Sequence, residues 1–121
     1  LDIDHFKSIN DRFGHPVGDE TLVYIAQLIK EHLRSTDKAV RWGGEEFIII
    51  YLETTADEIL KLTEKLRQKI EQHVFTTAGS TTASFGATLY KNGDTKESII
   101  KRADNALYMA KRGGRNRIEF L

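Results

Sequence analysis

The chain has 121 residues, of which 40% are hydrophobic and 30% are charged, a composition that fits one globular domain. Lysine plus arginine and aspartate plus glutamate both number 18, so no overall charge points to nucleic acid or a membrane surface as a partner. The absence of cysteine excludes disulfides, thiolate metal sites and cysteine nucleophiles, and no apolar run reaches membrane-spanning length. We expect a soluble, cytoplasmic domain without membrane contact of its own. Its start on a strand-like run at Leu1 indicates a piece of a longer protein, which could be membrane-anchored.

The first half of the chain predicts a strand, a polar turn region, a helix and a β-hairpin, in that order. The helix is indicated by apolar side chains that recur at helical spacing. The hairpin is indicated by paired glycines between two β-prone runs, since glycine supplies the positive φ of tight turns. These elements are expected at residues 1–4, 5–18, 19–34 and 39–52, with Gly43 and Gly44 at the turn.

The second half predicts two more helices and two more strands. Thr55 and Glu58 form a capping box, which predicts that a helix starts there and ends near His73. The total order β-α-β-β-α-β-α-β contains the six elements of a ferredoxin-like split βαβ. We therefore predict an α+β fold, βαββαβ with an extra C-terminal helix and strand, in a single domain. The remaining elements are expected as a strand at 81–90, a helix from about 99 to 112 and a strand at 117–121.

Acidic side chains gather at two places that the fold would bring together. Asp2 and Asp4 are separated by a single residue on a strand, so their carboxylates point to the same side. The first strand lies beside the hairpin in this topology, which brings Asp2 within reach of Glu45 or Glu46. Carboxylates this close repel one another unless a cation neutralises them, and Mg²⁺ prefers such oxygen ligands. The alternative is a pair of solvated acids at a strand end.

Two further groups suit a phosphate-bearing ligand. The polar turn region offers backbone N–H groups just after a strand, with Lys7 nearby, and such groups can bind phosphates. Asn10 and Asp19 offer an amide and a carboxylate, which match the edge of guanine; the alternative is a loop with Asx turns. Lys111 and Arg115 lie around the C-terminus of the last predicted helix, either as partners of the helix dipole or as a phosphate clamp.

Several short motifs occur in a fixed order along almost the whole chain. They lie at residues 2–11, 14–15, 18–19, 43–47, 84–86, 103–108, 110–111 and 114–116. Together they resemble the GGDEF domain, the catalytic domain of diguanylate cyclases, here in the Gly-Gly-Glu-Glu-Phe form. The resemblance implies a palm-like sheet related to nucleotide cyclases and polymerases. It also implies a reaction that joins two GTP into cyclic di-GMP and releases two pyrophosphates.

The resemblance implies a role for each residue of a two-metal site. Asp2 and Glu46 would hold two Mg²⁺ or Mn²⁺ ions, with the carbonyl of Ile3 assisting. Glu45 would either assist a metal or take the proton from the attacking 3′-hydroxyl, and the sequence does not separate these roles. The hairpin glycines would let the α-phosphate approach closely, so the implied catalytic set is Gly43, Gly44, Glu45 and Glu46.

The resemblance also implies how GTP is bound. Guanine would be recognised by Asn10 and Asp19, with Leu22 beside the base. The β- and γ-phosphates would be bound by backbone N–H groups and by a clamp of two cationic side chains. These phosphate-binding residues are Phe6, Lys7, Lys111 and Arg115.

The resemblance further implies regulation and assembly. Since one domain binds one GTP, the working unit would be a homodimer, with an N-terminal sensory or regulatory domain in the parent protein. Arg34 and Asp37 are similar to an RxxD site at which cyclic di-GMP inhibits the enzyme, although an arginine at a helix end followed by a turn aspartate is a common pattern. The family also has a segment before the first metal-binding aspartate that packs against the sheet, and this chain lacks it.

Two alternatives to an active cyclase remain. The first is a catalytically weak or inactive module that binds GTP or cyclic di-GMP and regulates a partner; such modules typically have an altered glycine turn. The second is another kind of nucleotide cyclase or polymerase palm, against which Asn10 and Asp19 argue as guanine readers.

Overall fold

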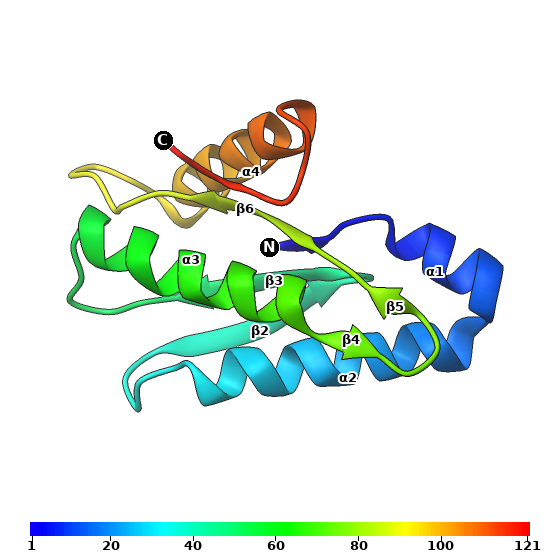
Figure 1. Cartoon of the computed structure of the whole chain (residues 1–121). Helices are drawn as coiled ribbons and strands as arrows, with labels where there is room; N and C mark the ends of the chain where they lie inside the picture. The colour runs from blue at the N-terminus through cyan, green and yellow to red at the C-terminus, as the bar shows by residue number, and fades with distance from the viewer.

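A computed structural model describes residues 1–121 as a five-stranded sheet flanked by helices (Figure 1). The strand order is β2-β3-β1-β6-β7, in which only the β6–β7 pair is parallel. The first four strands of this order have the ferredoxin-like topology, so the predicted α+β fold with its extra helix and strand is confirmed. The elements are β1 (Asp2–Ile3), α1 (Phe6–Phe13), α2 (His15–Glu31), β2 (Lys38–Gly43), β3 (Glu46–Ile50), α3 (Ala56–Gln72), β4 (Val74–Phe75), β5 (Gly79–Ser80), β6 (Ala83–Ala87), α4 (Lys96–Arg112) and β7 (Ile118–Phe120).

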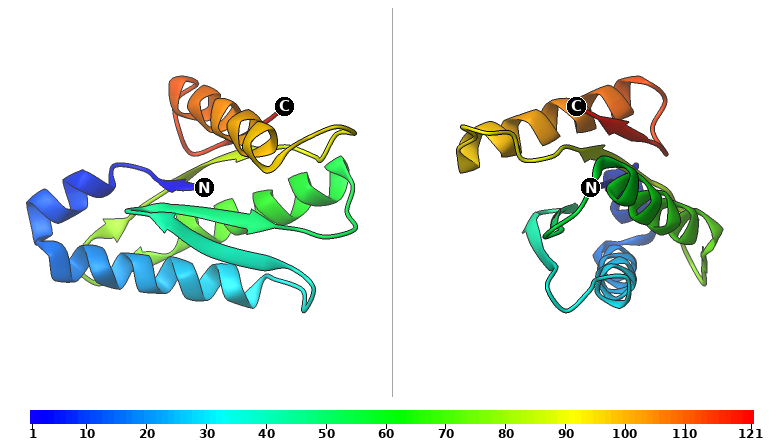
Figure 2. Two further views of the ribbon diagram at one scale, coloured as in Figure 1. Left: turned by 180° about the vertical axis from the view of Figure 1, so that it is seen from behind. Right: turned by 90° about the vertical axis from the view of Figure 1, so that its left-hand side faces the viewer.

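The helices form a layer on each face of the sheet. Helices α2 and α3 cover one face, and α4 lies on the other, where it packs on β6 and β7 (Figures 1 and 2). The core lies between the sheet and α2 and α3, and burying each of its large aliphatic side chains contributes about 2 kcal/mol. No helix in the structure is long and apolar enough to cross a membrane. The fully buried aliphatic side chains are Ile3, Ile25, Ile29, Leu66 and Ile70.

The predicted polar turn region is wrong, because two helices occupy it. Gly14, at φ 89°, separates α1 from α2, and Pro16 lies in the first turn of α2, where a missing N–H costs nothing. Helix α1 buries only Phe6 and Ile9, so its apolar face is too narrow to stand out in a polar sequence. Helix α2 therefore begins four residues earlier than predicted, and it ends three residues earlier. The two-residue strands β4 and β5 were not predicted, since strands this short have no periodicity.

The hairpin and the start of α3 have the predicted local structure. Gly43 pairs with Glu46 across the turn, and Gly44 has the positive φ of 51° that favours glycine. At the start of α3 the Glu58 N–H donates to Thr55 Oγ1 at 3.3 Å, and the Thr55 N–H donates to Glu58 Oε2 at 3.2 Å. This reciprocal pair is the predicted capping box, and it confirms that local chemistry defines where α3 begins.

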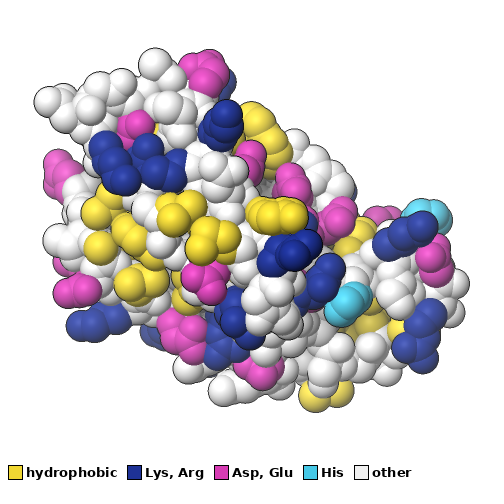
Figure 3. Space-filling model, turned by 90° about the horizontal axis from the view of Figure 1, so that it is seen from above, with side chains coloured by type: hydrophobic (Ala, Val, Ile, Leu, Met, Phe, Trp, Pro, Cys, Tyr) yellow, Lys and Arg dark blue, Asp and Glu magenta, His cyan; other side chains and the backbone are white.

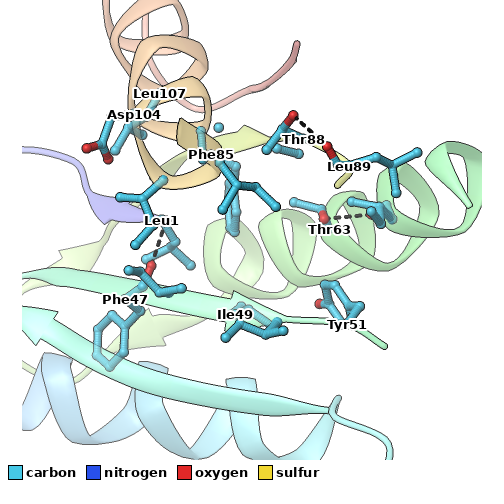
Figure 4. A pocket seen from close by; sticks show the side chains of 18 of the residues that line it. Leu1, Phe47, Ile49, Tyr51, Thr63, Phe85, Thr88, Leu89, Asp104 and Leu107 are labelled. Atoms are coloured by element: carbon cyan, nitrogen blue, oxygen red, sulfur yellow. Dashed lines mark hydrogen bonds between the residues drawn. The ribbon is translucent and has the colours of Figure 1, made fainter. Parts of the chain in front are cut away.

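An apolar cavity of about 860 Å³ lies between β3 and β6, where β1 is short (Figure 4). Strand β1 pairs with β3 only at Asp2 and Glu46, whereas β3 continues to Ile50. Phe47, Phe85 and other hydrophobic side chains line most of the cavity. Glu46 and Asp104 are also among the lining residues, so the cavity adjoins the polar site described below but is distinct from it.

Basic and acidic side chains alternate over the face seen in Figure 3, around a group of exposed hydrophobic side chains. The chain as a whole has equal numbers of acidic and basic residues, and on this face the two kinds are mixed rather than separated. Local clusters, rather than a broad field of one sign, must therefore provide any electrostatic recognition here.

Candidate active site

Strands β1 and β3 hold two carboxylates side by side. Asp2 and Glu46 are direct partners in the antiparallel register, and the Asp2 side chain is only 7% exposed. Burial and then the neighbouring Asp2 carboxylate raise the pKa of Glu46, and Asp104 acts in the same direction. Lys111 opposes this shift. The site therefore concentrates negative charge in a place that a cation would stabilise.

Helix α4 contributes both a cation and a third acid to this place. Lys111 Nζ lies 2.6 Å from Asp2 Oδ2, so one half of the predicted phosphate clamp is located at the carboxylate pair. Asp104 lies two turns earlier on the same helix and contributes to the pKa of Glu46. Sequence reasoning gave Asp104 no role. A separation of seven residues places Asp104 and Lys111 on the same face of a helix, and this spacing could have indicated that both face the site.

Asp4 has a different environment from Asp2, although the sequence placed both on the same side. Its Oδ2 accepts hydrogen bonds from Thr82 Oγ1 at 2.7 Å and from the Asn116 N–H at 3.0 Å, and its Oδ1 accepts from Ser84 Oγ at 2.6 Å. Asp4 is therefore a satisfied, buried acceptor.

No group of three or more His, Cys, Asp or Glu side chains with metal-binding geometry occurs in the structure.

The hairpin turn leaves open space beside the carboxylates. A Cβ added at Gly43 or at Gly44 would meet no atom within 4 Å, so a ligand can approach this backbone closely. The carbonyl of Glu45 accepts a hydrogen bond from the Ile3 N–H at 3.3 Å, which ties the turn to β1.

Helices α1 and α2 meet at the predicted guanine-reading residues. Asn10 Oδ1 is buried without a hydrogen-bond partner, and a Cβ added at Gly18 would lie 1.9 Å from it. Asp19 is the next residue on α2 and is exposed, and Leu22, one turn further, is buried. Leaving a buried polar atom unpaired costs about 1–3 kcal/mol, and a donor from a ligand would remove this cost.

The first turn of α1 presents free backbone donors where the sequence predicted a turn. His5 precedes this helix with φ 55° and makes no side-chain cap, so the N–H groups of Phe6 and Lys7 have no intrahelical acceptor. Such an N-terminus carries partial positive charge and binds anions. Arg115 has φ 65° in the turn after α4, and its guanidinium forms no ion pair.

Comparison with known proteins decides the family. Residues 1–117 match the family described as "Diguanylate cyclase, GGDEF domain". The chain belongs to this GGDEF family. Its Gly43-Gly44-Glu45-Glu46-Phe47 turn is therefore the GGDEF motif, with glutamate at the third position.

The curated relatives that match this chain are longer than it is. The chain is 40% identical to diguanylate cyclase DosC of Escherichia coli K12 and 44% identical to diguanylate cyclase DgcP of Pseudomonas aeruginosa, in each case over 98% of this chain. It spans only 27% and 18% of the lengths of these two relatives. Among solved structures, the GGDEF domain of DgcB from Caulobacter crescentus in complex with c-di-GMP superposes with a TM-score of 0.95 at 38% identity, covering 98% of this chain and 73% of that chain. The active GGEEF domain of a diguanylate cyclase from Vibrio cholerae gives 0.91 at 39% identity, covering 98% and 78%.

The RxxD residues of this GGDEF domain lie at the end of the hairpin opposite the carboxylates. Strand β3 separates them from Glu46 by about 15 Å. The Arg34 guanidinium binds both oxygens of Asp37 at 3.0 Å and also donates to the carbonyl of Leu52 at 2.7 Å. The backbone N–H groups of Arg34 and Leu52 donate to the same carboxylate at 2.9 and 3.3 Å. Asp37 therefore has no free oxygen for a ligand while Arg34 is paired with it.

Asp37 should make the stability of this GGDEF domain depend on acid pH. Hydrogen bonds from the Arg34 guanidinium lower the pKa of Asp37 below its ordinary value. Because the folded-state pKa is the lower one, the contribution is complete above about pH 4 and is lost as pH falls through the folded-state pKa. We expect Asp37→Asn to unfold at lower urea concentration than the wild type at pH 7, with the difference shrinking as the pH falls below about 4. A difference that stays constant over this range would show that the charge of Asp37 is not the cause.

Proposed function

We propose that the chain is the catalytic domain of a diguanylate cyclase that condenses two GTP into cyclic di-GMP. The observation that carries this proposal is the pairing of buried Asp2 with half-buried Glu46, beside Lys111 and at an open glycine turn. In each half-reaction the 3′-hydroxyl of one GTP attacks the α-phosphorus of the other, a P–O bond forms, and pyrophosphate leaves. Catalysis of this kind depends on positioning and on neutralising charge, which is what these groups supply.

The carboxylate pair has the donor chemistry for Mg²⁺ or Mn²⁺. Two like charges lie together, and partial burial with the Asp2 charge raises the pKa of Glu46, an arrangement that a divalent cation would stabilise. Asp2 and Glu46 would hold two such ions with the carbonyl of Ile3, and substrate phosphates would supply further oxygens. Bound there, the metal would neutralise phosphate charge and favour loss of the hydroxyl proton. We assign Glu45 either metal binding or acceptance of that proton.

The α1–α2 pair would bind the guanine end of GTP. The unpartnered Asn10 Oδ1 would accept from the exocyclic amine of guanine, and the Asp19 carboxylate would accept from the same Watson–Crick edge. Leu22 would contact the base. The free N–H groups of Phe6 and Lys7 would donate to the β- and γ-phosphates. Opposite them, the side-chain clamp would consist of Lys111 and Arg115.

The two-substrate reaction requires two copies of the domain. Each chain has one carboxylate pair and one uncapped α1 N-terminus, so each would hold one GTP. We therefore propose a homodimer in which the two sites face each other. Specific activity should rise with protein concentration, and a rate per molecule that is constant from nanomolar to micromolar protein would argue against this assembly.

The direct test is to incubate the intact, product-stripped protein with GTP and Mg²⁺ and to separate the nucleotides by chromatography. We expect cyclic di-GMP and pyrophosphate in a ratio of one to two. If a folded dimer binds GTP without making product, the protein is instead a regulatory module that binds the nucleotide.

We also propose that cyclic di-GMP inhibits the enzyme at Arg34 and Asp37. The Arg34 side chain is 45% exposed, so it can turn from Asp37 toward a guanine or phosphate of the product, which would free Asp37 for a guanine edge. Arg34→Ala should raise the product concentration for half-inhibition by about tenfold or more, since a hydrogen-bonded charge contact of about 1.5–3 kcal/mol is lost. The measurement is initial rate against added cyclic di-GMP. Lys30→Ala, which removes an exposed cation in the last turn of α2, is the matched control. Equal inhibition of Arg34→Ala and wild type would place the inhibitory site elsewhere.

A further inference from the structure

The turn after α4 has an unusual backbone. Gly114, Arg115 and Asn116 have successive φ values of 115°, 65° and 45°, all in the region that favours glycine. Each residue other than glycine in this region costs about 1 kcal/mol or more, so the turn persists only if its surroundings restrain it. The Arg115 N–H donates to the carbonyl of Ala110 at 3.0 Å, which closes the end of α4 but leaves Asn116 to be held by other groups.

Two anchors from distant parts of the chain hold Asn116. On one side its backbone N–H donates to Asp4 Oδ2 at 3.0 Å, and Asp4 is fixed in turn by the hydroxyl groups of Thr82 and Ser84. On the other side its Oδ1 accepts from Arg67 Nη1 at 2.8 Å. Both anchors are well buried: Asp4 is 4% exposed and the Arg67 side chain 14%.

The anchor on α3 is itself held in place. Arg67 donates to both oxygens of Glu64, at 2.8 and 2.6 Å, and to Glu71 Oε2 at 2.6 Å. These bonds fix the direction of its guanidinium before it contacts Asn116. The turn is thus held between Asp4, which follows β1, and Arg67 on α3, whereas the side chain of the neighbouring Arg115 forms no ion pair.

We propose that Asp4, Arg67 and Asn116 are positioning residues that hold this turn and thereby direct Arg115 toward the outer phosphates of GTP. The inference rests on the proposed function, in which Arg115 belongs to the phosphate clamp. A flexible arginine loses side-chain and backbone freedom when it binds, and a turn that is already fixed removes the backbone part of this cost. The anchors therefore act on affinity for the triphosphate and not on recognition of guanine.

The test compares two nucleotides that differ in the outer phosphates. Binding of α,β-methylene GTP, which cannot release pyrophosphate, and of GMP is measured by calorimetry with Mg²⁺ in the intact protein. Asn116→Gly removes the Oδ1 acceptor but accepts the positive φ, so the backbone remains feasible. Asn116→Asp keeps an acceptor for Arg67 and tolerates the same φ. Arg67→Met removes the second anchor without altering the turn itself.

We expect Asn116→Gly and Arg67→Met to weaken binding of the triphosphate analogue about tenfold while GMP binding changes less than about twofold. Asn116→Asp should restore the analogue affinity. In an Arg115→Ala background the Asn116→Gly change should have no further effect, because the residue that it positions is gone.

Three results would overturn the proposal. Equal losses for the analogue and GMP would show a general structural role, and a full effect in the Arg115→Ala background would show that Arg115 is not the residue positioned. If Arg115→Ala alone leaves analogue binding unchanged, the clamp assignment fails and this inference fails with it. Diguanylate cyclase activity is measured separately, as cyclic di-GMP formed from GTP. A lack of activity can therefore be distinguished from each of the three binding results above.

Discussion

Glu46→Gln should reduce cyclic di-GMP formation by about a thousandfold or more, because one of the two charges that would hold the metal is removed while the shape is kept. The same change should leave the fold intact or stabilise it slightly. Burial and Asp2 raise the pKa of Glu46, which means that the folded protein disfavours its anion, and neutral glutamine removes that repulsion. The measurements are product formation by chromatography and the midpoint of thermal unfolding.

The opposite responses of activity and stability make this prediction specific. Glu97→Gln, on the exposed first turn of α4, is the same chemical change away from the site and should retain wild-type activity. A Glu46→Gln protein that keeps more than a tenth of wild-type turnover would rule out Glu46 as an essential group. A large fall in thermal midpoint would instead mean that the residue supports the fold.

Features determined by neighbouring residues could be predicted from the sequence. Gly43 and Gly44 define the hairpin, and Thr55 with Glu58 defines the start of α3, because each uses backbone chemistry within a few residues. The order of these elements was enough to predict that the first strand lies beside the hairpin, with Asp2 within reach of Glu45 or Glu46, and the structure pairs Asp2 with Glu46.

Features that depend on distant contacts could not be predicted in this way. Lys111 reaches Asp2 across 109 positions, and Arg67 reaches Asn116 across 49, and neither pair has a local pattern. The pairing of Arg34 with Asp37 illustrates a further limit, because an RxxD motif indicates a spacing but not whether its two charges already satisfy each other. Short α1 was missed because its buried face consists of two residues.

Gly86→Ala should strongly destabilise the fold, because the added methyl group meets backbone atoms of α4. Gly86 lies on β6 directly beneath α4, and a Cβ there would lie 2.2 Å from both the Ala103 carbonyl oxygen and the Leu107 nitrogen. Both neighbours are helix backbone, so the whole helix must move. We expect a loss of about 3 kcal/mol, at the upper end for overpacking, and a fall of roughly 10 °C in the thermal midpoint.

The consequences of Gly86→Ala for the active site follow from what α4 carries. Lys111 lies one turn beyond Leu107, so a helix lifted from β6 draws its ammonium away from Asp2. Gly43→Ala is the matched control, since its added Cβ meets no atom within 4 Å and should cost little stability. In the proposed enzyme Gly43→Ala should nevertheless lower turnover, because the methyl group fills the space through which the α-phosphate approaches. Gly86→Ala should therefore lower chiefly the free energy of unfolding, and Gly43→Ala chiefly the turnover rate. Equal stability of the two variants would show that α4 is not held by close contact at Gly86.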